Sequence, residues 1–144
     1  MTFTKAMLEA SPVRIDLDLD DVANAIDASA ACEQACTSCA NANLGEEDVF
    51  RLRRCIALCQ NCADVCAVTV RVLSRPFEFD HAVAHGVLQT CVRTCKSSED
   101  ECHLHAPHHH HCAICEQACR ACLAACTALL EAEAFRELRK IAGG

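Results

Sequence analysis

Cysteines recur along this chain at steps of three and four residues, the spacing that places side chains on one face of an α-helix. The chain has 15 cysteines in 144 residues. The clearest run steps 3, 4, 3, 4, and it comprises Cys112, Cys115, Cys119, Cys122 and Cys126. Such a run is the a/d stripe of a heptad pattern, where a helical bundle normally places leucine. The pattern therefore predicts helices that present thiols to a common core.

Three further cysteine stripes complete this pattern. A second run steps 4, 3, 4, and it comprises Cys55, Cys59, Cys62 and Cys66. The two remaining runs are shorter, and they comprise Cys32, Cys36 and Cys39 in one case and Cys91, Cys95 and Cys102 in the other. Because the four stripes together contain every cysteine, we predict four helices with one thiol-bearing face each.

Capping and breaking residues set the expected limits of these helices. The stripes fall in the segments 18–43, 46–74, 78–104 and 108–133. A carboxylate at Asp18 or Asp20 suits the first N-cap, and Pro107 suits the first turn of the last helix. Short connections make neighbouring helices antiparallel. We therefore expect an all-α fold, an antiparallel up-down-up-down four-helix bundle with a cysteine-lined core and a short N-terminal extension.

The length of the chain favours a single domain over residues 1–144, large enough to bury a core. Residues 1–17 are expected to form the N-terminal extension, with a short helix from Thr4 to Ala10. Residues 18–133 are expected to form the bundle. Residues 134–144 are expected to form a C-terminal tail, with a helical extension to Ile141.

An antiparallel arrangement brings the four cysteine-bearing segments to one end of the bundle. The other end receives apolar residues, which are Val22, Ile26, Val70, Leu73, Phe77, Phe79, Leu129 and Leu130. We expect these residues to form an apolar plug. The mouth of the thiol end lies beside a histidine-rich loop that carries His103, His105, His108, His109, His110 and His111. A collar of imidazoles over the thiols is therefore expected.

The chemistry of the thiols points to a soft metal ion. Thiolates at i and i+4 have Cβ atoms about 5 to 6 Å apart, a gap that copper(I) can bridge. Two separate thiolates per ion would leave a charge of −1 at every site, which a buried core cannot tolerate. If each sulfur bridges two ions, the core is neutral at roughly one ion per cysteine, on the order of 15 ions. The pattern therefore favours storage of many copper(I) ions.

All 15 cysteines are candidate copper(I) ligands on this reasoning. Histidine offers a weaker, exchangeable nitrogen ligand beside them. We expect His109 and His111 to bind copper as it enters, with His103, His105 and His108 as weaker candidates. The alternative for this loop is a solvated polar segment that is rich in histidine. His81 and His85 fall at the plugged end, where core or surface roles are expected.

Three other classes of protein compete with a copper(I) store. A zinc or general heavy-metal sequestration protein would use about four thiolates per zinc ion in a tetrahedron. A thiol redox regulator would depend on one reactive Cys-x-x-Cys pair with a lowered pKa. An iron–sulfur protein would show a C-x2-C-x2-C run, which the sequence lacks. Stoichiometry separates the first of these from copper(I), because copper(I) needs only about one thiolate per ion.

Charge and segment composition bound the partners and the compartment. The formal net charge is −7, and no cluster of Lys and Arg favours nucleic acid. We find no apolar run of about 20 residues and no signal-peptide pattern at the N-terminus, so membrane partners are not expected. A cytoplasmic location is expected, where cysteines stay reduced and a high cysteine count points to metal.

Three segments together resemble the cytosolic kind of cysteine-rich four-helix-bundle copper storage protein. They are Cys59-Gln-Asn-Cys62-Ala-Asp-Val-Cys66, the histidine-rich turn that leads into His111-Cys112, and the run from Cys112 to Cys126. The resemblance spans residues 20–130. It implies a non-enzymatic store in which cysteines of all four helices bind copper(I), histidines at the open end admit the ion, and subunits associate as tetramers. A copper chaperone or chelator is an expected partner.

The sequence also departs from a fully cysteine-lined bundle. Several stripe positions that can carry cysteine hold other residues, which are Val22, Ala25, Ser29, Leu88 and Ser98. We therefore expect this chain to hold less copper than a bundle with thiols at every stripe position.

Overall fold

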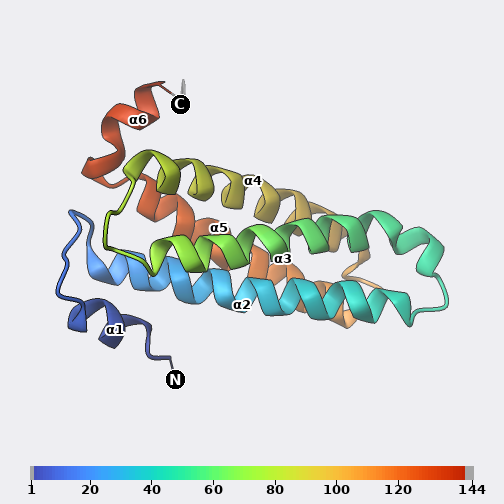
Figure 1. Ribbon diagram of the computed structural model, residues 1–144. Coiled ribbons are helices and arrows are strands. Elements are labelled where there is room, and N and C mark those ends of the chain that lie inside the picture. The colour runs from blue at the N-terminus through green and yellow to red at the C-terminus, as the bar shows by residue number, and fades with distance from the viewer. Residues whose placement is uncertain (1, 142–144) are drawn as a thin grey trace.

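A computed structural model describes residues 2–141 of the protein. Within this range the long helices are α2 (Leu19–Leu44), α3 (Arg53–Leu73), α4 (His81–His105) and α5 (His110–Leu130). Helices α2 and α4 run in one direction along the molecule, and α3 and α5 run in the other (Figure 1). Each long helix packs against two others, in the cyclic order α2, α3, α4, α5. The all-helical prediction is confirmed for the described residues.

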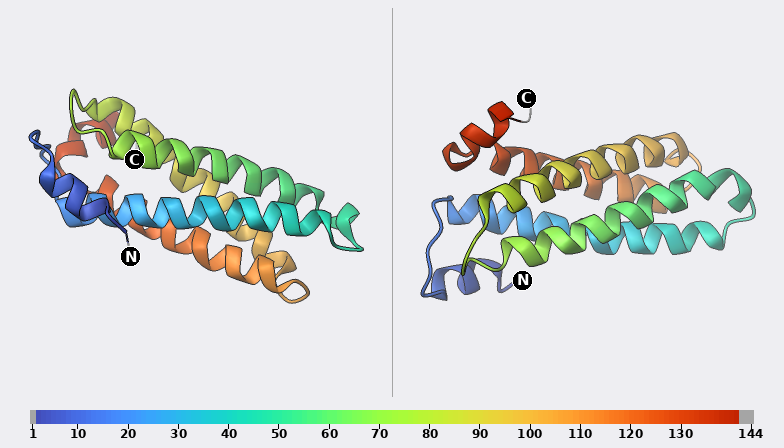
Figure 2. Two further views of the ribbon diagram at one scale, coloured as in Figure 1. Left: turned by 60° about the horizontal axis from the view of Figure 1, so that its bottom comes forward. Right: turned by 45° about the horizontal axis from the view of Figure 1, so that its top comes forward.

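Short helical segments flank the bundle, a name used below for α2 to α5 together. Helix α1 (Thr4–Ala10) precedes it, η1 (Val49–Leu52) leads into α3, and η2 (Glu133–Phe135) and α6 (Arg136–Ile141) follow α5. Figures 1 and 2 place α1 and α6 at one end of the bundle and η1 at the other. The short helix predicted from Thr4 to Ala10 is confirmed. The second long helix begins later than predicted, because the turn before Arg53 is a 3-10 helix.

Side-chain caps define the starts of two long helices. The carboxylate of Asp18 accepts a hydrogen bond from the Asp21 backbone N–H at 3.0 Å, so Asp18 caps α2. Asp80 caps α4 in the same way, with the Val83 N–H as donor at 3.0 Å. Each cap satisfies an N–H group that has no partner inside its own helix. Asp18 and Asp80 therefore fix where α2 and α4 begin.

The connection between α4 and α5 differs from the prediction. Pro107 does not start the last helix; α5 begins at His110, with His109 at the N-cap position. The carbonyl oxygen of His105 accepts hydrogen bonds from the N–H groups of His108 and His109, each at 3.0 Å. This closes a tight turn that contains Pro107. Helix α4 extends to His105, so His103 belongs to its last turn and not to the loop.

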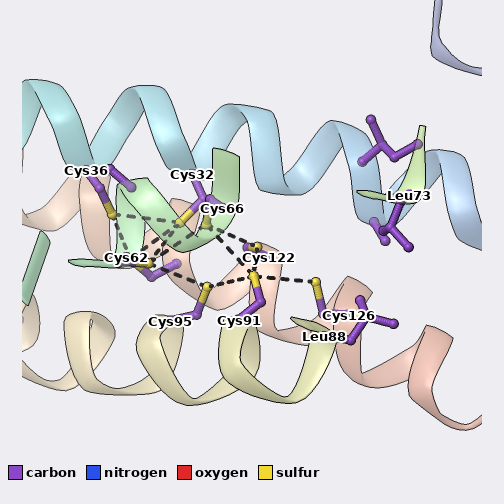
Figure 3. Close-up of a cluster of buried hydrophobic side chains, with 14 of the residues drawn as sticks. Cys32, Cys36, Cys62, Cys66, Leu73, Leu88, Cys91, Cys95, Cys122 and Cys126 are labelled. Atoms are coloured by element: carbon purple, nitrogen blue, oxygen red, sulfur yellow. Dashed lines mark hydrogen bonds between the residues drawn. The ribbon is translucent and has the colours of Figure 1, made fainter. Parts of the chain in front are cut away.

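The end opposite the thiols is closed by apolar side chains. Those that are fully buried include Val22, Leu73, Leu88, Leu129 and Phe135. Val70, Phe79 and Leu130 pack against them and are partly buried. Figure 3 shows Leu73 and Leu88 beyond the last cysteine sulfurs. The predicted apolar plug is therefore present.

The prediction is wrong for one member of the plug, Phe77. Phe77 is 74% exposed, whereas Phe135 is fully buried. The turn between α3 and α4 passes through a positive φ of 54° at Glu78 and directs Phe79 to the core instead. Phe135 comes from η2, in the segment expected to be a tail. The chain after α5 therefore folds back to complete the plug.

The core between the helices is lined with thiols. All 15 cysteines are buried, and each is a free thiol. Small residues such as Ala23, Ala25 and Ala40 occupy the same core, which lets the helices approach closely. The predicted cysteine-rich core is confirmed.

Two helical segments are long and apolar enough to cross a membrane, Val49–Leu73 and His110–Leu130. This result differs from the prediction that the chain has no apolar run of about 20 residues. Both segments contain many cysteines and alanines, which are apolar on a hydropathy scale. Core helices of soluble proteins meet the same criterion. In this protein the cysteines of both segments are buried against the other helices.

We expect Phe135→Ala to lower the free energy of unfolding of the metal-free protein by about 3–5 kcal/mol, because it opens a cavity in the plug. Urea unfolding followed by circular dichroism measures this. The matched control is Phe77→Ala, whose exposed ring should contribute less than about 0.5 kcal/mol. Equal losses in the two variants would contradict the role assigned to Phe135.

Candidate metal centre

The cysteine stripes of the four helices meet in layers of sulfur atoms. Two groups of four cysteines contain one cysteine from each long helix, and the four sulfur atoms of each group lie within 4.8 Å of one another. One group is Cys32, Cys66, Cys95 and Cys122. The other, nearer the mouth, is Cys39, Cys59, Cys102 and Cys115. A third group of four is Cys32, Cys36, Cys62 and Cys119. Two groups of three are Cys39, Cys55 and Cys112, and Cys91, Cys122 and Cys126. The layers form a column along the bundle.

Short sulfur–sulfur contacts connect these layers, as Figure 3 shows. The Sγ atom of Cys36 lies 3.6 Å from those of Cys115 and Cys119. Pairs one turn apart on a helix are 3.8 to 4.0 Å apart, as in Cys32 with Cys36 and Cys91 with Cys95. These distances far exceed a disulfide bond of about 2.05 Å. The column is therefore a continuous set of separate thiols.

Several sulfurs belong to more than one group. Cys32, Cys39 and Cys122 are each members of two. A closed tetrahedral zinc site uses four ligands of its own, so groups that share sulfurs cannot act as independent zinc sites. Shared sulfurs suit soft ions joined by bridging thiolates. Because the groups share sulfurs, the column fits one multi-ion cluster and does not fit a row of isolated sites.

Two buried serines interrupt the stripes. The hydroxyl oxygen of Ser98 lies 3.4 to 4.0 Å from four sulfurs, which belong to Cys36, Cys59, Cys102 and Cys119. Ser29 lies 3.5 Å from the sulfur of Cys122 and 3.7 Å from that of Cys126. A hydroxyl forms hydrogen bonds with thiols but is a poor ligand for a soft ion. These positions therefore lack a soft ligand inside the column.

Hydrogen bonds among the thiols raise the pKa of some core cysteines, which favours the protonated thiol, and lower the pKa of others, such as Cys59 and Cys62. The hydrogen bond with Cys119, together with burial, raises the pKa of the Cys32 thiol. The hydrogen bonds with Cys122 and Cys91, together with burial, raise the pKa of Cys126. A neutral thiol avoids the desolvation penalty of a buried thiolate. A metal ion that binds here must displace these protons.

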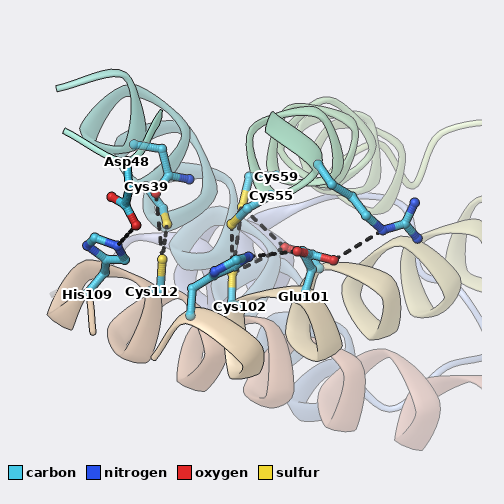
Figure 4. A network of polar contacts seen from close by, with 12 residues as sticks. Cys39, Asp48, Cys55, Cys59, Glu101, Cys102, His109 and Cys112 are labelled. Carbon is cyan, nitrogen blue, oxygen red and sulfur yellow. Dashed lines mark hydrogen bonds and ion pairs between the residues drawn. The ribbon is translucent and has the colours of Figure 1, made fainter. Parts of the chain in front are cut away.

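His111 is the histidine that reaches the thiols. Its Nδ1 atom lies 3.4 Å from the sulfur of Cys39 and 3.6 Å from that of Cys112. The Cys112 thiol also donates a hydrogen bond to the Asn43 Oδ1 atom at 3.7 Å. His109 lies between the carboxylates of Asp48 and Glu46, and Figure 4 shows its contact with Asp48. Two of the six loop histidines thus gather at the mouth.

The weaker candidate histidines lie elsewhere. His103 and His105 contact buried carboxylates on the flank of the bundle, those of Glu116 and Glu101, at 2.8 Å in each case. Figure 4 shows Glu101 beside Cys102, whose sulfur faces the core. His108 is exposed. These three histidines are therefore not placed against the sulfur column.

The two histidines at the plugged end have partners of their own. His81 lies 2.6 Å from the Asp16 carboxylate, and this hydrogen bond lowers the pKa of Asp16. His85 is buried against Phe135, with ring centroids 5.6 Å apart, and burial lowers its pKa. Both contacts fit the structural roles expected from the sequence.

The sequence pattern does not predict the two acidic residues at the mouth, Glu46 and Asp48. Glu46 and Asp48 contact His109, and Glu46 also contacts His111 at 3.3 Å. The available signal is the predicted antiparallel arrangement, which brings the connection that holds Glu46 and Asp48 to the same end of the bundle as the histidine-rich loop. That arrangement does not show which side chains of the two connections meet.

Comparison with known proteins places this geometry in context. Among solved structures the chain is similar to the copper storage protein Ccsp from Streptomyces lividans loaded with 10 copper equivalents. The two are 41% identical with a TM-score of 0.87, and the match covers 88% of this chain and 97% of that chain. It is also similar to a cytosolic copper storage protein from Streptomyces lividans with five coppers, at 44% identity and a TM-score of 0.78, over 78% of this chain and 94% of that one.

Two further matches come from sequence. An uncharacterized cysteine-rich protein of Bacillus subtilis (strain 168), YhjQ, is 31% identical over 104 residues, which are 72% of this chain and 91% of the relative. The family model described as copper storage protein matches residues 18–131, a range that contains the bundle and all 15 cysteines. The chain therefore belongs to the copper storage protein family.

Proposed function

We propose that this protein is a non-enzymatic cytosolic store and buffer for copper(I). In this proposal the four long helices act as one antiparallel up-down-up-down bundle and a single domain. The observation that carries it is the sharing of sulfurs between groups of thiols, as at Cys32, Cys39 and Cys122. Bridging thiolates let a buried core remain near neutral while it holds many monovalent ions. The relatives from Streptomyces lividans, described as copper-loaded and cytosolic, support the metal and the compartment.

The proposed ligands are the thiolates of all 15 cysteines, with His111 as a nitrogen ligand at the mouth and His109 behind it. Each copper(I) ion that binds replaces a thiol proton, and the proton leaves to solvent. The total charge of the core therefore changes little as it fills. Since the apolar plug and the caps of α2 and α4 need no metal, we propose that the fold stays intact as copper enters and leaves.

His111 is proposed to pass copper(I) from the mouth to the first thiols. One side of its ring faces Cys39 and Cys112, and the other faces the solvent-accessible carboxylate of Glu46. An imidazole is an exchangeable ligand for copper, so it can release the ion to a stronger thiolate. We further propose, from the family resemblance, that subunits assemble as tetramers and that a copper chaperone or chelator exchanges copper at the mouth.

The first test is the capacity for copper(I). Anaerobic titration of the reduced protein against a chromophoric competitor should show ten or more tightly held ions per chain, on the order of one per cysteine. Saturation at about three or four ions, with zinc bound equally well or better, would instead identify a tetrahedral zinc protein.

The second test concerns the interruption at Ser98. We expect Ser98→Cys to raise the copper(I) capacity by about one ion, because a soft ligand then replaces a hydroxyl that touches four sulfurs. Native mass spectrometry counts the ions. Ser98→Ala is the control and should leave the capacity unchanged. A folded Ser98→Cys protein with no gain in copper would show that the interruption does not limit loading.

The third test separates admission from storage. His111→Ala should slow copper(I) uptake by roughly tenfold, the size of effect typical of losing one group that supports a metal site. The final number of ions should stay within about one of the original. Stopped-flow transfer from a coloured copper(I) complex measures the rate.

His110→Ala is the matched control, since this neighbouring ring is exposed. Equal uptake rates in the two variants would remove His111 from the admission route.

A further inference from the structure

The carboxylate of Glu46 joins the two histidines of the mouth through different oxygen atoms. Its Oε2 atom lies 3.1 Å from His109 Nδ1, and its Oε1 atom lies 3.3 Å from His111 Nε2. The two imidazole rings are stacked, with centroids 5.6 Å apart and an angle of 29° between their planes. One ring nitrogen of each histidine therefore lies next to the same carboxylate.

The remaining nitrogen of each ring is held by a different partner. Asp48 Oδ2 lies 3.1 Å from His109 Nε2, and the thiols of Cys39 and Cys112 face His111 Nδ1. In metal sites a histidine ligand commonly donates its second N–H to a carboxylate, which fixes the tautomer and the ring orientation. The Asp48 carboxylate contacts the second ring nitrogen of His109 in this way. Both rings thus direct their free nitrogen toward Glu46.

The two contacts of Glu46 have the spacing of neighbouring ligand atoms on a metal ion. Ligand atoms about 2.1 Å from an ion, at angles between 90° and 109°, lie about 3.0 to 3.4 Å from one another. The two contacts of Glu46 fall in this range. The side chain of His109 is only 10% exposed, so its ring is already held in place. The carboxylates of Glu46 and Asp48 bring two negative charges, which one divalent ion would balance.

We propose that Glu46, His109 and His111 form a binding site for a borderline divalent cation, Cu²⁺ or Zn²⁺, with Asp48 as its positioning residue. Imidazole and carboxylate ligands favour such ions, whereas thiolates select copper(I). The site lies outside the sulfur column and goes beyond the copper(I) store proposed above. His111 serves one role at a time, because Nε2 faces the divalent site while Nδ1 faces the thiols. A divalent ion held here therefore competes with copper(I) for His111.

The test uses Co²⁺ as a spectroscopic probe of the reduced full-length protein. The first equivalent should produce the d–d absorption of a nitrogen and oxygen site, without the intense sulfur-to-cobalt charge-transfer absorption. Glu46→Gln and His109→Ala should each weaken Co²⁺ binding at least tenfold. Asp48→Ala should weaken it roughly 10- to 100-fold, and Asp48→Asn, which keeps an acceptor oxygen, should lose less.

The matched controls are Glu47→Gln and His110→Ala, which change exposed neighbours of the same residue types. Charge-transfer absorption from the first equivalent would overturn the proposal, because the ion would then be on thiolates. Unchanged Co²⁺ affinity in His109→Ala would overturn it as well. The copper(I) capacity of Glu46→Gln and of Asp48→Ala, measured separately, shows whether the store is intact. A failed divalent site therefore remains distinguishable from a failed copper(I) store.

Discussion

Thiols that face thiols across four helices are the contact on which the rest of this structure depends. A layer such as Cys39, Cys59, Cys102 and Cys115 forms only if all four helices are in register. A slip of one turn, about 5.4 Å, would replace each layer by a different set of side chains. Small thiols also bury less apolar area than leucine, so they contribute less to holding that register. The structure must therefore fix the register elsewhere, through the caps Asp18 and Asp80 and through the apolar plug.

Because the thiols contribute little to holding the helix register, the two ends of the molecule have different roles and different chemistry. At one end Leu73, Leu129 and Phe135 exclude water and stabilise the helix packing. At the other end the thiols contact one another, and hydrogen bonds and burial raise the pKa of some of them, such as Cys32. Proteins folded by their metal have no such apolar end and lose their structure without the ion. Here the groups that stabilise the fold are separate from the groups proposed to hold copper, so the proposed loading and release require no refolding.

The sequence predicts the thiol faces well, because a period of three and four residues identifies both a helix and its buried side. Contacts between distant segments are not accessible in this way. Phe135 and Phe77 have the same side chain, and the choice between them depends on how η2 folds back. The pairing of His109 with Glu46 and Asp48 joins segments more than 60 residues apart and depends on the meeting of two connections at the mouth. The prediction of His103 and His105 as loop residues is wrong, because α4 continues to His105. Hydrogen bonds such as those of the His105 carbonyl oxygen set this helix end, and the residue pattern does not reveal them.

The placement of the serines bears on the proposed copper capacity of this core. Along α4 the sulfurs stop at Cys95 and resume at Cys102, seven residues and about 10 Å farther on. Ser98 fills the interval, and its hydroxyl contacts both Cys59 and Cys102 on one side and Cys119 on the other. The column continues past it through the 3.6 Å contact between Cys36 and Cys115. Because serine and cysteine have nearly the same shape, exchanging them alters the ligand set while the helix packing stays the same. Under the proposed function, the number of ions that such a core holds depends on which side chains occupy the stripe positions.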